Sequence, residues 1–288
     1  MGPARSSGRL RARPGHGCPR AGRSGAGRTG VPEMPMPRRR TSLTVAFATA
    51  AAALATAAPA SAATTVVNCP AQNLQTAIDN AASGDTLLVR GTCTGTFTIG
   101  KSLTLAGSSG ATLNGNNAGR TLTVNGPTTV RVTLTGLTLT GGAGVGLGGG
   151  LFNNGATVTL RSSTVRNNTS TEEGGGIGSL GTTTLDGSTV RDNTSKYGGG
   201  IANGPGVLTV FWSTVRGNTA TQWGGGLLVA GQARVVGSTI TANTAQGGPL
   251  SGGGIYNFSN LTLLGNSITA NTPNNCSSTT PLAGCTTV

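Results

Sequence analysis

The chain has 288 residues, a formal net charge of +13, 50 glycines and an aromatic content of 3%. This aromatic content is too low for a conventional globular core of this size. Small and β-branched side chains must therefore fill the interior. Ten of the 20 basic residues precede Ala63, and the rest of the chain carries ten basic and six acidic residues. The high charge therefore belongs mainly to the N-terminal segment and does not indicate a nucleic-acid partner.

Residues 1–33 are rich in Arg, Gly and Pro and have no hydrophobic periodicity. We interpret them as a mis-assigned upstream segment or a disordered basic extension, the alternative being a nucleic-acid-binding tail.

Residues 34–62 have the three parts of a secretory signal peptide. Arg38–Arg40 form the positive region, Ser42–Ala58 is an Ala-rich apolar run, and Ala60–Ala62 supply small residues for cleavage. The sequence therefore predicts a mature chain that begins at Ala63, although an uncleaved anchor is the alternative for this run.

A short amphipathic helix is predicted at Leu74–Ala82, because Leu74, Ala77, Ile78 and Ala81 follow helical spacing. Gly84 and Asp85 then turn the chain into a strand at Thr86–Arg90. Irregular strand-like runs follow at Phe97–Ile99, Ser102–Leu105, Thr121–Val124, Val130–Leu134 and Leu137–Thr140.

Residues 148–271 repeat one pattern five times. Each copy opens on three glycines and a Leu or Ile, continues through a Thr-rich apolar run, and ends on a hydroxyl pair, an aliphatic residue, two variable residues and Asn-Thr. The aliphatic residues are Val165, Val190, Val215 and Ile240, each 25 residues after the last, and then Ile268. A fixed period of this length predicts a solenoid, in which an amphipathic element must cover the open first coil. We expect the helix at Leu74–Ala82 to do so.

Alternation within the repeat predicts which side chains enter the core. Val158 and Leu160 should point inward, as should Leu185, Val210, Val235, Leu263 and the five recurring aliphatic residues. The recurring asparagines should stack at strand spacing and form a structural ladder of amides: Asn168, Asn193, Asn218, Asn243 and Asn271. The glycine triplets should occupy bends with positive φ or places where backbones approach closely.

The helix followed by Gly84-Asp85 and a strand, the GGGI or GGGL openings and the ST(V/I)xxNT endings resemble right-handed parallel β-helix proteins of the pectate-lyase-like superfamily, in particular secreted bacterial members. The repeats are also partly similar to those of polymorphic outer-membrane proteins. The resemblance implies an all-β, right-handed parallel β-helix over residues 63–271, with a short N-terminal capping helix. It implies no particular activity.

Four cysteines follow the predicted signal peptide. Because the two ends of a solenoid are far apart, this fold leaves only the pairs Cys69–Cys93 and Cys276–Cys285. The second pair would close a loop in the polar tail, residues 272–288. A chain of this kind is expected to be released rather than anchored, with no membrane contact after signal cleavage.

No convincing catalytic group emerges from the mature sequence. Glu172 and Glu173 are interpreted as a solvated loop pair, and Lys196 and Tyr197 have no evident partner. The only histidine of the chain, His16, lies in the leader, so no Ser-His or Cys-His pair is expected. We expect neither a metal site nor a cofactor.

Arg166, Arg191 and Arg216 occupy one repeat position, and we call them the arginine column. They should stack on an outer face at about 4.8 Å, either as solvated surface or as a site that grips a polyanion such as an acidic polysaccharide. The sequence thus predicts a secreted, monomeric protein with a binding or structural role towards glycans or the cell envelope. The alternative is a polysaccharide-active lyase or hydrolase.

Overall fold

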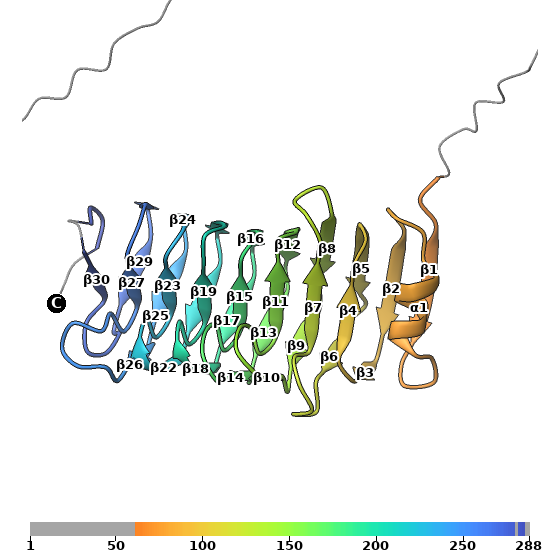
Figure 1. Cartoon of the computed structure of the whole chain (residues 1–288), viewed down its shortest axis with the longest axis horizontal. Helices are drawn as coiled ribbons and strands as arrows, with labels where there is room; N and C mark the ends of the chain where they lie inside the picture. The colour runs from red at the N-terminus through yellow and green to blue at the C-terminus, as the bar shows by residue number, and fades with distance from the viewer. Residues whose placement is uncertain (1–60, 280–281, 286–288) are drawn as a thin grey trace, which may run out of the picture. The chain divides into compact units, whose positions relative to one another are not determined.

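The computed structural model describes residues 61–279 and 282–285. The expected extension (1–33) and nearly all of the expected signal peptide (34–62) lie outside these residues. The described chain forms an all-β parallel solenoid with a single short helix (Figure 1). No helix among the described residues is long and apolar enough to cross a membrane.

Each full turn of the solenoid passes through three long sheets, which we call A, B and C, and every pairing is parallel. Sheet A has nine strands: β1 (Thr64–Asn68), β2 (Thr86–Arg90), β5 (Leu103–Gly107), β8 (Arg131–Thr135), β12 (Thr157–Arg161), β16 (Thr182–Asp186), β20 (Val207–Phe211), β24 (Gln232–Val236) and β28 (Leu261–Leu264). Sheet B has eight: β3 (Thr92–Thr94), β6 (Thr112–Asn114), β9 (Thr138–Thr140), β13 (Thr164–Arg166), β17 (Thr189–Arg191), β21 (Thr214–Arg216), β25 (Thr239–Thr241) and β29 (Ser267–Thr269).

Sheet C also has eight strands: β4 (Phe97–Ile99), β7 (Leu122–Asn125), β11 (Leu151–Asn154), β15 (Ile177–Ser179), β19 (Ile201–Asn203), β23 (Leu227–Val229), β27 (Ile255–Asn257) and β30 (Cys276–Ser278). After the third to the seventh strands of sheet B, a short sheet D is inserted between B and C. Its strands are β10 (Ala143–Gly144), β14 (Thr169–Ser170), β18 (Thr194–Tyr197), β22 (Thr219–Trp223) and β26 (Thr244–Ala245).

The predicted inward side chains form the core. Val158, Leu160, Leu185, Val210 and Val235 are all 0% exposed, and Leu263 in the last turn is 9% exposed. The recurring aliphatic residues of sheet B are equally buried, with Ile268 at 6%. Burial of each such side chain contributes roughly 1.5–3 kcal/mol, and stacking spreads this gain along the solenoid.

Helix α1 (Leu74–Asn80) is two residues shorter than predicted. Asn73 caps its start, with Oδ1 accepting from the backbone N–H of Thr76 at 3.0 Å. The helix ends because Ala81 is extended and the Asp85 carboxylate accepts from the N–H of Ala82 at 2.8 Å. Leu74 and Ile78 are buried in the core.

Two corners of each turn require a left-handed residue. At the corner between sheets A and B, these residues are Gly136, Ser162, Gly187, Trp212, Gly237 and Gly265. At the corner between sheets B and D, they are Gly141, Asn167, Asp192, Gly217, Ala242 and Ala270. The first glycine of each triplet is also left-handed, with φ of 70° at Gly148 and 67° at Gly174, as the repeat pattern predicted.

Candidate functional site

The recurring asparagines form a continuous buried ladder. The side-chain Nδ2 of Asn168 donates to Oδ1 of Asn193 at 3.0 Å, and Asn193 repeats this contact with Asn218 at 2.9 Å. The ladder continues through Asn243 and Asn271 and ends at Asn275. Each amide also satisfies backbone groups of neighbouring turns, so the ladder fixes the corner that precedes sheet D.

A second ladder, which the sequence analysis missed, lies at the corner between sheets A and B. The hydroxyl oxygens of successive buried serines accept from the backbone N–H one turn earlier: Ser188 from Ser163, Ser213 from Ser188, and Ser238 from Ser213, at 3.0–3.1 Å. The signal was present, because each of these serines is the first residue of the hydroxyl pair in its repeat. Like the asparagines, they serve the fold.

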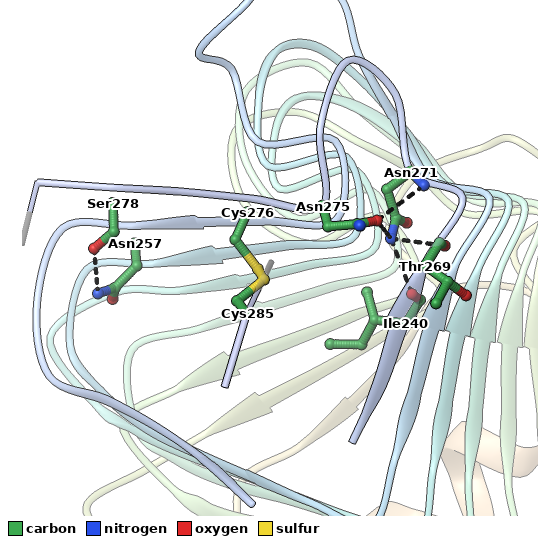
Figure 2. The surroundings of a disulfide bond; sticks show 8 residues. All are labelled: Ile240, Asn257, Thr269, Asn271, Asn275, Cys276, Ser278 and Cys285. Carbon is green, nitrogen blue, oxygen red and sulfur yellow. Dashed lines mark hydrogen bonds between the residues drawn. A yellow bond between two sulfur atoms is a disulfide. The ribbon is translucent and has the colours of Figure 1, made fainter. Parts of the chain in front are cut away.

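The structure brings together the two cysteine pairs that the sequence predicted. The Cα atoms of Cys69 and Cys93 are 5.0 Å apart, and those of Cys276 and Cys285 are 6.2 Å apart. Figure 2 shows the second pair beside the end of the asparagine ladder, where Asn275 accepts from Asn271. The first pair joins the turn before α1 to strand β3, so each bridge holds one end of the solenoid.

The three residues of the arginine column lie in register on neighbouring strands of sheet B. Arg166 pairs with Arg191, and Arg191 with Arg216, across β13, β17 and β21. Arg216 is exposed, whereas Arg166 and Arg191 are half-buried. The Arg191 guanidinium forms an ion pair with the neighbouring Asp192 carboxylate. Parallel pairing therefore brings the three guanidinium-bearing residues together on the outer face of sheet B.

Beside the arginines runs a row of hydroxyl residues, which we call the hydroxyl column. Its members face outward from successive strands of sheet B: Thr92, Thr112, Thr138, Thr164, Thr189, Thr214, Thr239 and Ser267. The outward residues of β13, β17 and β21 are thus three threonines and three arginines, all hydrogen-bond donors and none negatively charged.

Glu172, Glu173, Lys196 and Tyr197 form a cluster, which corrects the expectation that Lys196 and Tyr197 lack partners. Lys196 Nζ lies 3.2 Å from Glu172 Oε2 and 5.2 Å from the centre of the Tyr197 ring. The hydrogen bond with Glu172 raises the pKa of Lys196. Glu173 is half-buried. Burial, and then the nearby charge of Glu172, raise the pKa of its carboxyl.

Tyr197 begins a row of aromatic rings over the last turns, which we call the aromatic row. Its ring centre is 5.3 Å from that of Trp223, which is 5.4 Å from Tyr256 and stacked on it. Phe258 lies 4.7 Å from Tyr256 and meets Trp223 edge-on. Trp223 and Phe258 stay 36% and 43% exposed. Irregular spacing in the sequence hides this row.

Arg120 occupies the same side of the solenoid, two turns before the glutamates. Its Nε donates to the carbonyl of Leu147 at 2.6 Å, and its guanidinium lies 4.9 Å from the centre of the Phe152 ring. Burial lowers its pKa. Since the Leu147 backbone pairs with Glu173 in the next turn, Arg120 fixes the loop on which the glutamate cluster rests.

Among the described residues, no three His, Cys, Asp or Glu side chains group in a way that could hold a metal ion. No protein-family model matches this chain, and neither does the sequence of any curated protein. The structure shows a parallel β-solenoid, and the resemblance of its repeats to pectate-lyase-like proteins stays a prediction from the sequence.

Proposed function

We propose that this chain is a secreted, right-handed parallel β-helix protein, of the pectate-lyase-like kind, that binds an acidic polysaccharide through the arginine column. The observation that carries the proposal is the register of Arg166, Arg191 and Arg216 on one outer face beside the hydroxyl column. In this account α1 covers the open first turn, since Leu74 and Ile78 bury their side chains there.

The chemistry of this face suits a polyanion. Residues in register on adjacent parallel strands lie about 4.8 Å apart, so three guanidiniums form a short row of positive charge. Guanidinium groups bind carboxylates bidentately, and the neighbouring threonines can donate to sugar hydroxyls. Repulsion between adjacent guanidiniums costs roughly 1 kcal/mol per pair in water, a cost that a bound polyanion would remove.

The two cysteine pairs support an extracellular location, because disulfides persist in oxidising compartments. The sequence of residues 34–62 supports secretion independently. On this account the mature protein starts at Ala63, acts as a monomer and meets its ligand in the medium or at the cell envelope.

The test compares two triple variants of equal charge. Arg166→Ser, Arg191→Ser and Arg216→Ser together remove the column, while Arg90→Ser, Arg131→Ser and Arg234→Ser remove three exposed arginines from sheet A. Retention on immobilised polygalacturonate should fall at least tenfold for the first variant and change little for the second. Equal losses would mean that only net charge matters, and no retention of the wild type would reject the proposal.

One observation favours the alternative of a polysaccharide-active enzyme. Glu173, with its raised pKa, and Glu172, paired to Lys196, provide two carboxyls with different environments beside the aromatic row. Two carboxyls in unequal environments are the usual basis for separate acid and base roles. An enzyme would release new reducing ends from a polysaccharide, and Glu173→Gln would abolish that release while polygalacturonate retention persists.

A further inference from the structure

Trp212 occupies a position that suits it poorly. It is the left-handed residue at the corner between sheets A and B, with φ of 42°, where four of the five equivalent residues are glycine and the fifth is Ser162. Large side chains rarely adopt this conformation. In addition, Trp212 is 69% exposed, so most of its indole ring is in contact with solvent. Strain and exposure of this kind are typical of residues kept for recognition.

Trp212 is nevertheless held in place. A Cβ atom added to Gly237, the corner residue of the next turn, would lie 2.8 Å from Cδ1 of Trp212, so the indole rests directly on the Gly237 backbone. The ring of Phe211 packs beside it, with the ring centres 5.7 Å apart and the planes tilted by 36°. One surface of the indole is therefore supported by the solenoid, and the remainder faces outward.

The same corner carries an exposed pair of opposite charges. Arg161, Asp186 and Phe211 are in register on successive strands of sheet A. Nε of Arg161 lies 3.9 Å from Oδ2 of Asp186, and the two side chains are 61% and 43% exposed. Because the two charges balance locally, this pair favours neither an anionic nor a cationic ligand. It offers a carboxylate acceptor and guanidinium donors next to two aromatic rings.

We propose that Trp212, Phe211, Asp186 and Arg161 form a second binding site, which takes an uncharged pyranose unit of a glycan. The apolar C–H face of the sugar would stack on the exposed indole, while neighbouring hydroxyls donate to Asp186 and accept from Arg161. Small-molecule sites commonly combine aromatic walls with a few placed polar groups in this way. The site is separate from the arginine column, since Trp212 lies at the corner before β21 whereas Arg216 is the last residue of that strand.

The chain contains two tryptophans, so the test can be made specific. In a Trp223→Phe background, fluorescence reports on Trp212 alone. Titration with soluble xylan, β-1,3-glucan, galactomannan and their oligosaccharides should give a saturable shift in Trp212 emission with at least one probe. Asp186→Ala should weaken that binding about tenfold, whereas the triple arginine-column variant should bind as well as the wild type.

The variant Trp212→Gly separates recognition from structure. It introduces the residue found at four of the five equivalent corners, so we expect an equal or higher melting temperature together with complete loss of binding to the neutral glycan. A lower melting temperature would show that Trp212 is a packing residue and would overturn the proposal. The absence of a fluorescence response to every probe would also overturn the proposal. The same holds if the wild type is a dimer that Trp212→Gly converts to a monomer and added sugar does not change the fluorescence.

Discussion

Replacement of Asn218 by Ala should break the asparagine ladder at its centre. The Asn218 side chain is fully buried and makes four hydrogen bonds. Its Oδ1 accepts from the backbone N–H and from Nδ2 of Asn193 at 3.0 and 2.9 Å, and its Nδ2 donates to the Val190 carbonyl at 3.0 Å and to Oδ1 of Asn243 at 2.9 Å.

The magnitude follows from these contacts. A typical hydrogen bond contributes about 1 kcal/mol net, and a buried group left without a partner costs about 1–3 kcal/mol. Alanine also leaves a space under Gly200, against which the amide packs. We therefore expect a loss of about 3–5 kcal/mol in the free energy of unfolding and, for a domain of this size, a fall in melting temperature of roughly 10 °C.

Urea unfolding followed by circular dichroism measures this loss. The matched control is Asn154→Ala, because Asn154 is exposed and makes a single side-chain hydrogen bond, to Asn125 at 3.2 Å. That variant should stay within about 0.5 kcal/mol of the wild type. If Asn218→Ala costs less than about 1 kcal/mol, the ladder is a consequence of stacking and not a source of stability.

Three further predictions concern the corner, the core and the glutamate cluster. Ala242→Asn should stabilise the protein by about 0.5–1 kcal/mol in a thermal melt, because Ala242 is left-handed with φ of 54° and Asn tolerates that conformation better; a loss of stability would contradict this reasoning. Val190→Asp should abolish cooperative unfolding, since Val190 is 0% exposed in the middle of sheet B; near-native stability would show that the core tolerates a charge. Glu173→Gln should raise the melting temperature at pH 7 but not at pH 3. A raised pKa means that the folded state holds the Glu173 proton more tightly than the unfolded state, so wild-type stability falls as pH rises from the ordinary Glu pKa through the raised one. An equal effect of the substitution at both pH values would exclude a titration of Glu173.

The regular part of the fold was predictable because buried side chains recur at a fixed spacing in the sequence. Val190 and Val215 lie in register as their 25-residue spacing requires, and the asparagines follow from the same period. Strand β1 was missed because Thr65 and Val66 are both exposed, which leaves no alternation to detect. Strands β3 and β6 are three residues long and carry too little pattern.

The sites were only partly predictable. The arginine column follows from repeat alignment, which fixes register, but the ion pair between Lys196 and Glu172 depends on a three-dimensional contact between successive turns. The aromatic row was hidden because Trp223 belongs to sheet D and Tyr256 to sheet C, at different places in their repeats. Trp212 could have been noticed, since alignment places it where neighbouring repeats have Gly187 and Gly237.

The salt dependence of polygalacturonate binding tests the central claim most directly. Each cation that neutralises a polyanion releases about 0.7–0.9 counterions in nucleic acid complexes. If Arg166, Arg191 and Arg216 grip the polysaccharide, the slope of log Kd against log salt concentration should be smaller by about 2 in their triple Ser variant than in the wild type. The control variant lacking Arg90, Arg131 and Arg234 should keep the wild-type slope. Identical slopes for the wild type and the column variant would contradict the account.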